Sequence, residues 1–380
     1  MKKTKILSYR PSYIRKYGIG YAATALTLGM NSKTVSCDIF SIQSEYSKES
    51  PHIKEAFSKG LYKFLAKICS SEILSKIADS IFLKRMQHYD VAYLWPGCSI
   101  DVYRRLKQKQ KKIVIESVNC HQQVAKDILD KESILLGGLS THNITDADIE
   151  EENAKLDMAD FIFSPSPQVT ASLTSMQVDK RKIIETSYGL DKTDLLAGKK
   201  YSNDGKLSFN ALFVGSVIPR KGIHLLLDYW KAAGVDGKLK VIGKIETAVE
   251  EIVSAYQEDN SIEFVSFTND LTTHYKNADV FIMPSLEEGS PLVTYLAIGA
   301  GLPCIVSPMA GDGVIRNNIE GCLIPPHDKD KWVATIQKLA NDKVSQEKLA
   351  DASRQRAEYF LWPEVAQRRA AKLLNKLGIE

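Results

Sequence analysis

Phe213-Val-Gly-Ser-Val-Ile-Pro-Arg-Lys-Gly222 is the stretch that decides how this chain folds. The apolar run 211–214, which ends at Gly215, predicts a buried strand. Directly after the stretch, apolar side chains recur at the spacing of one helix face, at Ile223, Leu226, Leu227 and Trp230. The sequence therefore predicts a strand, a glycine-containing loop and an amphipathic helix.

The loop of this unit is suited to an anion. Backbone N–H groups and the positive end of a helix favour negative charge, and Arg220 and Lys221 add two full charges. Gly215 and Ser216 open the same loop. We expect a phosphate or diphosphate here, and the alternative is a solvated basic turn. The spacing of a Walker phosphate loop is absent.

The composition is that of a soluble globular protein, with 44% hydrophobic and 25% charged residues. A length of 380 residues exceeds one ordinary core, so we expect two domains. The net charge of +4 does not indicate nucleic-acid binding. Six cysteines without C-x-x-C spacing argue against a zinc site or a disulfide framework, and no metal is expected. The polar N-terminus indicates neither a signal peptide nor a membrane span, so we expect a cytoplasmic protein.

Strands and helices alternate through the first half of the chain. Lys5–Tyr9 predicts a strand, followed by a turn with Gly18 and Gly20 and then a helix, which again can cradle an anion. Lys112–Glu116 predicts another strand, and His121 lies just past its carboxyl end, where open parallel sheets bind ligands. His121 is therefore either structural or catalytic. The alternation predicts an α/β fold with a parallel, doubly wound sheet.

Residues 53–86 predict a long helical region with two interpretations. Its apolar stripe consists of Phe57, Leu61, Phe64, Leu65 and Ile68, and its basic side consists of Lys54, Lys59, Lys63 and Lys67. Such a helix lies on an anionic membrane surface or packs its stripe into the core with a solvated basic face. We favour the core-facing interpretation.

A polar, glycine-punctuated segment over 188–208 is the best candidate for an interdomain linker. After it, the strand and helix pattern restarts, and the last amphipathic helix begins at Pro363. We predict an N-terminal Rossmann-like domain over 1–188, completed by a helix at about 363–380, and a C-terminal Rossmann-like domain over 189–362.

A second dense cluster follows a predicted strand that ends at Pro284-Ser285. The acidic turn Glu287-Glu288-Gly289 comes next, and a helix opens near Pro291. Backbone groups at a helix opening can bind phosphate, and a carboxylate beside them can accept hydrogen bonds from sugar hydroxyls. The residues expected at the phosphate are Gly289, Ser290, Pro291, Leu292 and Val293. Two cations, open amides and a carboxylate suit a sugar joined to a diphosphate.

Here the chain resembles the family 4 glycosyltransferases of the GT-B fold, in which two Rossmann-like domains face each other across a cleft. The resemblance is strong over 209–327 and looser before it. It rests on several motifs together, namely Arg220-Lys221, Glu288-Gly289, Gly301-Leu302-Pro303, Tyr188-Gly-Leu-Asp191 and Gly321-Cys-Leu-Ile-Pro-Pro326.

The resemblance implies a retaining, metal-independent hexosyltransferase that uses a UDP- or GDP-linked sugar and no separate cofactor. In such an enzyme Arg220 and Lys221 would hold the donor diphosphate. Glu288 would orient the sugar, and His121 would contact sugar or acceptor from the first domain.

The resemblance also implies further binding residues and partners. Gly18 and Gly20 match the family's first-domain glycine loop, and Phe267 lies in a loop expected near the base. The implied acceptor is a glycan or lipid-linked glycan of bacterial surface polysaccharide synthesis, with peripheral contact to the inner membrane surface.

Two departures from the family pattern concern the donor site. Leu296 stands where the family has the second glutamate that holds the ribose hydroxyls, and leucine cannot accept a hydrogen bond. Losing such a charged acceptor costs about 1.5–3 kcal/mol of donor binding. Ser216 stands where many relatives have an arginine. We favour an active enzyme, because the phosphate cations and the sugar carboxylate remain.

Other functions fit parts of this pattern. A GT-B sugar-nucleotide epimerase would bind the same donor without a separate acceptor. Because of Leu296, the chain could also be a sugar-nucleotide sensor or a catalytically weakened partner subunit. A glycosidase fits poorly, since paired carboxylates across the bond are required. A dehydrogenase fits poorly because no G-x-G-x-x-G follows the first strand.

Overall fold

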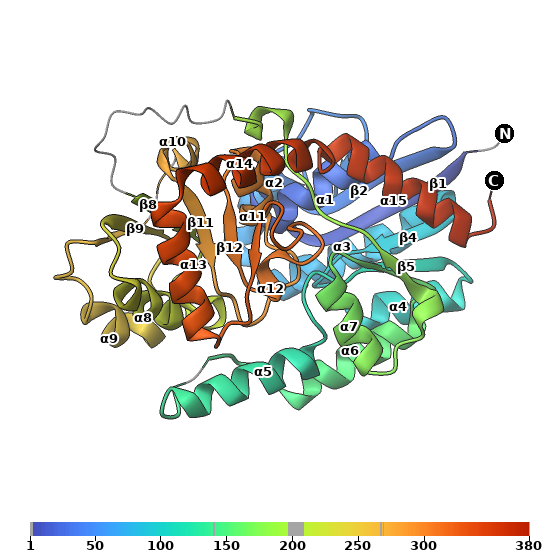
Figure 1. The fold of residues 1–380 in the computed structure, drawn as a ribbon. Helices are drawn as coiled ribbons and strands as arrows, with labels where there is room; N and C mark the ends of the chain where they lie inside the picture. Colours follow the sequence, from blue (N-terminus) through green and yellow to red (C-terminus); the bar gives the residue numbers. More distant parts are fainter. Residues whose placement is uncertain (1–2, 140, 197–208, 267, 269, 380) are drawn as a thin grey trace.

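The chain forms two parallel β-sheets, each flanked by helices (Figure 1). The computed structural model describes residues 3–379 except 140, 197–208, 267 and 269. The first sheet has the strand order β3-β2-β1-β4-β5-β6-β7, and the second has the order β10-β9-β8-β11-β12-β13. The prediction of two parallel, doubly wound sheets is confirmed.

Each sheet is built from one continuous part of the chain. The first consists of β1 (Thr4–Ile14), β2 (Val35–Ser44), β3 (Ile53–Glu55), β4 (Val91–Leu94), β5 (Lys112–Glu116), β6 (Phe161–Ser164) and β7 (Ile183–Glu185). The second consists of β8 (Phe209–Val214), β9 (Gly237–Ile242), β10 (Ile262–Val265), β11 (Val280–Met283), β12 (Cys304–Val306) and β13 (Gly321–Leu323). Central strands such as β4 and β11 are buried along their whole length, because helices cover both faces of a doubly wound sheet.

The helices follow the strands in alternation. Those of the first half are α1 (Gly18–Gly29), α2 (Lys59–Ile68), α3 (Ser71–Arg85), α4 (Ile100–Gln108), α5 (Gln122–Leu135), α6 (Asp146–Met158) and α7 (Pro167–Ser175). Those of the second half are α8 (Ile223–Ala233), α9 (Glu250–Ser254), α10 (Leu271–Asn277), α11 (Leu292–Gly299), α12 (Pro308–Gly311), α13 (Lys329–Asn341), α14 (Lys343–Glu358) and α15 (Trp362–Lys376). Among the described residues, no helix combines the length and the apolar character needed to cross a bilayer.

The strand orders create a topological switch point in each sheet. In the first sheet it lies between β1 and β4, and in the second between β8 and β11. Connections leave these neighbouring strands toward opposite faces, so a crevice opens outside their carboxyl ends, where ligands bind in this kind of fold. The loops after β8 and β11 carry the Arg220-Lys221 pair and the Glu287-Glu288 pair.

The last helix, α15, returns to the first sheet and lies beside α1 (Figure 1). A Cβ added at Gly29 would lie 2.6 Å from the Cβ of Ala366, so the two helices touch closely at this glycine. Gln367 Nε2 donates to the Gly29 carbonyl at 2.5 Å. α15 thus packs against a helix of the first half, while the predicted domain bounds, including the helix at about 363–380 and the boundary at 188/189, stay predictions.

The region 53–86 differs from the favoured interpretation. It contains a short strand, β3, and two helices that break between Ile68 and Ser71, where Ser70 caps α3 through the Ile73 amide at 3.3 Å. The predicted apolar stripe does not face the core as a unit. Phe57 is buried ahead of α2 and Leu65 is half-buried, whereas Leu61, Phe64 and Ile68 are exposed. An apolar stripe shows that a helix is amphipathic, but tertiary packing decides which side is covered.

The predicted linker begins inside the fold. Leu190 is buried, its N–H donates to the Phe360 carbonyl at 3.0 Å, and its carbonyl accepts from the Trp362 N–H at 3.1 Å. A Cβ at Gly189 would lie 2.4 Å from the Phe360 oxygen. The chain passes from one half to the other near Gly189 and returns near Phe360, and these two segments pack against each other here. Residues 197–208 of the predicted linker lie outside the described residues.

Candidate active site

The basic loop after β8 holds Arg220 and Lys221 in a tight 3₁₀ turn, Pro219–Lys221, directly before α8. Gly222 ends this turn with φ of +69°, and a Cβ there would lie 2.1 Å from the carbonyl oxygen of Pro284 after β11. Only glycine fits both the left-handed backbone and this close approach. The loops after β8 and β11 are therefore locked together, and Arg220 N-terminal to Gly222 is held against the acidic turn.

The two cations meet the two carboxylates predicted near them. Arg220 Nη1 lies 3.0 Å from Oε2 of Glu287 and 4.0 Å from Oε2 of Glu288, and Lys221 Nζ donates to Oε1 of Glu288. The side chains of Glu287 and Glu288 are 3% and 7% exposed, whereas those of Arg220 and Lys221 are 27% and 12% exposed. This four-residue set is called the acid–base cluster below. Its carboxylates are covered, and its cations, above all Arg220, reach solvent.

Burial and charge act in opposite directions on the acid–base cluster. Burial lowers the pKa of Arg220, but the negative charges of Glu288 and Glu287 outweigh it and raise that pKa above its ordinary value. Burial raises the pKa of Glu287, opposed by the charge of Arg220 and reinforced by Glu288. Arg220 stays cationic at every physiological pH, as binding a diphosphate requires.

Glu287 also links the two halves of the molecule, a role that sequence reasoning missed. Its Oε1 accepts a hydrogen bond from the Cys120 N–H at 3.3 Å, just after β5. The neighbouring Gly289 approaches the same segment, since a Cβ there would lie 1.7 Å from the Val118 oxygen. Ser166 Oγ donates to the Gly289 carbonyl at 2.5 Å. The adjacent carboxylates in the sequence signalled a shared site, but only the fold shows that one of them contacts the first domain.

A cavity of about 550 Å³ lies where these segments meet. Arg220 and Glu287 close it from the second half, and residues after β4 and β5 and on α5 and α6 line it from the first half. Its lining consists of residues 94–98, 115–120 and 141–144, with Tyr103, Gln122, Ala125, Leu129, Asp148, Glu151, Glu152, Lys155 and Leu156. A volume of this order suits a sugar-sized ligand. Burial raises the pKa of Glu152 above its ordinary value.

His121 does not line this cavity. Its side chain is fully buried and caps α5: Nδ1 accepts from the Gln123 N–H at 3.2 Å, so Nε2 carries the proton and donates to Asn153 Oδ1 at 2.9 Å. Of the two interpretations left open by the sequence, this structure supports the structural one. Its neighbours Cys120 and Gln122 line the cavity instead.

The predicted phosphate-binding turn before α11 is only partly open. Ser290 is buried and bonds to Tyr295 Oη at 2.8 Å, while Pro291, Leu292 and Val293 are half-buried. Leu296 is half-buried too and packs against the core of the second domain. Leu296 therefore contacts apolar side chains on one side of α11, and its own side chain offers a ligand no hydrogen-bonding group.

The other predicted residues are placed as follows. Gly215, with φ of +150°, lies under Lys221, whose Cδ is 3.4 Å from the position of an added Cβ, and Ser216 beside it is exposed. Gly18 begins α1 with φ of +61°, and a Cβ at Gly20 would lie 3.1 Å from the Arg15 backbone. A Cβ at Gly18 would meet no described atom within 4 Å, and the atoms nearest to one at Gly20 belong to Arg15 and Ile14, so neither glycine adjoins the acid–base cluster. Phe267 lies outside the described residues.

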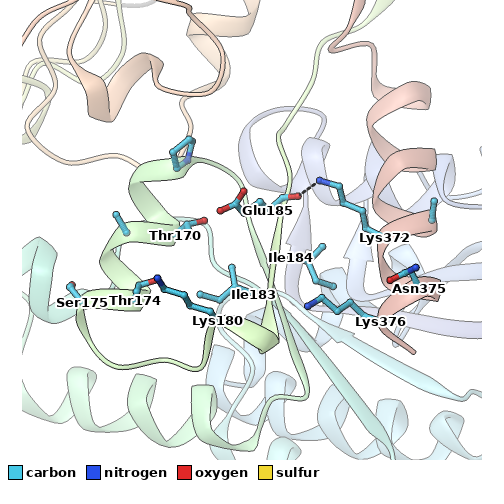
Figure 2. Close-up of a pocket in the computed structure, with 13 residues that line it drawn as sticks. Thr170, Thr174, Ser175, Lys180, Ile183, Ile184, Glu185, Lys372, Asn375 and Lys376 are labelled. Atoms are coloured by element: carbon cyan, nitrogen blue, oxygen red, sulfur yellow. Dashed lines mark hydrogen bonds between the residues drawn. The ribbon is translucent and has the colours of Figure 1, made fainter. Parts of the chain in front are cut away.

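A larger groove, of about 1070 Å³, lies between α7, β7 and α15 (Figure 2). None of the predicted site residues lines it. Two of its lysines are engaged with main-chain carbonyls: Lys372 Nζ donates to Glu185 at 2.7 Å, and Lys376 Nζ donates to Arg181 at 2.8 Å. The cavity beside the acid–base cluster is therefore the better candidate for an active site, although it is smaller.

Comparison with protein families supports a transferase domain in the second half. Residues 208–342 match the family described as glycosyl transferases group 1. The chain is 36% identical over 94 residues to the Escherichia coli UDP-Gal:alpha-D-GlcNAc-diphosphoundecaprenol alpha-1,3-galactosyltransferase, covering 23% of this chain and 24% of that protein. It is 26% identical over 237 residues to the capsular polysaccharide biosynthesis glycosyltransferase CapM of Staphylococcus aureus, covering 59% and 57%. The chain thus spans from a quarter to just over half of the length of these relatives.

Solved structures show the same fold over nearly the whole chain. Sucrose-phosphate synthase from Thermosynechococcus elongatus aligns with a TM-score of 0.75 and 18% identity, covering 99% of both chains. The lipopolysaccharide outer core galactosyltransferase WaaB aligns with a TM-score of 0.71 and 16% identity, covering 98% of this chain and all of the other. The protein thus has the two-domain GT-B fold, and its second half carries the sequence pattern of the group 1 glycosyl transferases.

Proposed function

We propose that this protein is a retaining hexosyltransferase that moves a sugar from a UDP- or GDP-linked donor to a glycan or lipid-linked glycan. The observation that carries the proposal is the acid–base cluster. It places a guanidinium and an ammonium at the switch point of the second sheet, beside a cavity closed by both domains. The relatives named above, which act in polysaccharide and lipid-linked glycan synthesis, support the acceptor class.

The chemistry follows from where charge develops. As the bond from the sugar to the diphosphate breaks, negative charge grows on the phosphate oxygens. A cation 4 Å away stabilises that charge by about 4 kcal/mol at an effective dielectric constant near 20. Glu287 and Glu288 pair with Arg220 and Lys221. A diphosphate would replace part of these contacts, and the freed Glu288 could then accept hydrogen bonds from the sugar.

The retaining course and metal independence are parts of the same proposal. The leaving phosphate would accept the proton of the acceptor hydroxyl on the face from which it departs, held there by Arg220 and Lys221. The acceptor would enter from the first domain through the cavity, where Glu152 and Gln122 offer polar contacts. His121 has no part in this step, since its side chain is enclosed.

The test is a panel of UDP- and GDP-sugars scored by thermal stabilisation of the purified protein. We expect at least one donor to raise Tm, because a ligand at about 100 times its Kd adds about 2.7 kcal/mol of stability. The same donor should raise the Tm of an Arg220→Ala Lys221→Ala variant much less. No shift with any donor would contradict the proposal.

Leu296 gives one observation in favour of a second candidate, a catalytically weakened donor-binding subunit. A donor that binds but is neither transferred to an acceptor nor epimerised would support that function. Release of free epimerised sugar nucleotide would identify an epimerase instead.

A further inference from the structure

The outward faces of α2 and α3 carry large apolar side chains that the protein itself does not cover. They are Leu61, Phe64 and Ile68 on α2 and Ile73 and Ile77 on α3, and each is 40–64% exposed. These five residues define the α2–α3 face. Their spacing of three or four residues places them in line along each helix. Single exposed apolar residues are common on protein surfaces, but five on two contacting helices mark an interaction site.

The exposure does not come from loosely attached helices, because the inner sides of both are anchored. Tyr62 packs its ring 5.6 Å from that of Tyr13 in β1. On α3, Leu74, Ala78 and Phe82 are buried in the core of the first domain. The α2–α3 face is thus a fixed, outward-facing surface of the folded domain.

Positive charge accompanies the apolar residues. Residues 59–85 contain five lysines and one arginine but only two acidic residues, Glu72 and Asp79, which leaves a net charge of +4, the value of the whole chain. Asp79 is buried and accepts hydrogen bonds from Tyr9 Oη at 2.6 Å and Ser99 Oγ at 2.8 Å, so it does not oppose the lysines at the surface. Glu72 is paired with Lys76 at 2.6 Å.

Lysines and apolar side chains alternate on this face. A shallow groove of about 480 Å³ on α3 is lined by three isoleucines, Ile73, Ile77 and Ile81, together with Lys76, Ser80 and Lys84. On α2, Lys63 and Lys67 are exposed beside Phe64 and Ile68. Lysine can bury its methylene chain among apolar groups while its ammonium stays in a polar layer.

We propose that the α2–α3 face is a docking surface for a bilayer that contains anionic lipids. The centres of protein–protein interfaces are depleted of lysine, whereas basic amphipathic helices with large apolar side chains insert into the boundary between headgroups and acyl chains. The combination of Leu61, Phe64 and Ile68 with three lysines on the ten residues of α2 fits the second case. Lipid phosphates provide the complementary charge.

The position of the face gives the docking a consequence for the enzyme. Through Tyr13, α2 lies at the carboxyl end of β1, the sheet edge at which the interdomain cavity also opens. A protein docked through the α2–α3 face would therefore receive a lipid-linked acceptor at the membrane side of its cavity. The docking itself requires neither donor nor transfer, so it can be tested separately from the proposed function.

The test is flotation of the full chain with vesicles of phosphatidylcholine alone or mixed with phosphatidylglycerol, without any nucleotide sugar. We expect binding to the anionic vesicles only, and weaker binding at higher salt. A Lys63→Gln Lys67→Gln variant should bind about 25-fold more weakly, because each lysine near an anionic surface contributes about fivefold. A Leu61→Gln Phe64→Gln variant should lose measurable binding.

The matched control is Ile134→Gln Leu135→Gln, which removes two apolar side chains that are 77% and 70% exposed at the end of α5. This control should bind vesicles like the unchanged protein, and every variant should have the same Tm as the unchanged protein. Equal binding by the Leu61→Gln Phe64→Gln variant, or no binding by the unchanged protein, would overturn the proposal. Self-association that only the Leu61→Gln Phe64→Gln variant abolishes, without vesicle binding, would instead show a contact between copies of the chain.

Discussion

Two groups of residues in this molecule pair cationic side chains with glutamates, but the two groups differ in how far solvent reaches them. Glu116 and Arg369 are both fully buried, with Nη1 2.7 Å from Oε2 and Nη2 3.1 Å from Oε1. Arg369 also donates to the Ser187 carbonyl at 2.8 Å. In the acid–base cluster, by contrast, Arg220 is 27% exposed and lines a cavity.

The difference separates a structural ion pair from an exchangeable one. Burial lowers the pKa of Arg369, but Glu116 outweighs it and the pKa lies above its ordinary value. Every donor of that guanidinium faces a protein acceptor, so nothing remains for a ligand. Arg220 is held by fewer contacts and meets solvent, so an incoming anion can compete for it. Exposure and unsaturated hydrogen bonding, more than charge, distinguish the candidate active site.

The largest effect should follow from breaking the enclosed pair. Arg369→Met would leave Glu116 buried without a counter-charge and cost about 3–5 kcal/mol of unfolding free energy. Urea unfolding at equilibrium measures it. Lys372→Met on the same helix removes an exposed cation and should cost no more than about 1 kcal/mol. Equal losses in the two variants would show that enclosure of the Glu116–Arg369 pair has no energetic consequence.

Removing a cation of the acid–base cluster should affect catalysis rather than folding. Lys221→Ala is expected to lower the transfer rate by about 10²–10³, the usual effect of removing one fixed donor at a developing oxyanion. Its loss of unfolding free energy should stay well below that of Arg369→Met. Lys231→Ala, ten residues farther along and paired with Asp259 at the surface, is the control. Full activity of the Lys221→Ala protein would remove this lysine from the mechanism.

A third variant adds a carboxylate on α11, near the acid–base cluster. Leu296→Glu should tighten donor binding by about tenfold or more, if the ribose hydroxyls lie beside α11 as the family resemblance implies. Calorimetric titration with the donor found in the thermal panel gives the Kd, and Leu296→Met controls for repacking. An unchanged Kd in the glutamate variant would place the ribose elsewhere.

The smallest effect concerns a buried glutamate whose two histidine partners are enclosed to different degrees. It lies where α5 meets the second domain. Glu132 is buried, with Oε1 2.6 Å from His224 Nε2 and Oε2 3.0 Å from His327 Nε2. Burial raises its pKa, but hydrogen bonds and charge from His224 and His327 outweigh it, so the pKa lies below the ordinary value. A lowered carboxyl pKa stabilises the folded state above the unfolded pKa of about 4.3, and this contribution is lost as pH falls through the folded pKa.

The corresponding variant is Glu132→Gln. It should be less stable than the unchanged protein by about 1 kcal/mol near pH 7, and the difference should shrink below about pH 4. Urea unfolding at a series of pH values measures both. A difference that stays constant down to acid pH would show that Glu132 acts by packing alone.

The parts that sequence could predict are those set by strand order. Arg220-Lys221 and Glu287-Glu288 follow two strands that each end in an apolar run, and parallel strands bring their carboxyl ends to one edge. Their meeting was therefore predictable, and the distances confirm it. The family motif contains one glutamate at this place, so the sequence predicts a role for Glu288 alone. The separate contact of Glu287 with Cys120 depends on how the domains approach each other.

The parts that sequence could not predict depend on neighbours distant in the chain. His121 follows a strand as a ligand residue would, but Asn153 and Gln123 occupy both of its nitrogens. The stripe has the periodicity of a core helix, yet α2 rests on the fold through Tyr62 and only one residue of the stripe, Leu65. Local pattern determines that a face exists, and the tertiary arrangement determines what covers it.

The return of α15 to the first sheet also has a consequence for synthesis. Glu116 is synthesised long before Arg369, so the first domain keeps an uncompensated carboxylate in its interior until α15 has been made and has docked. A truncation just before α15 would thus destabilise the first domain, although every strand of its sheet is still present.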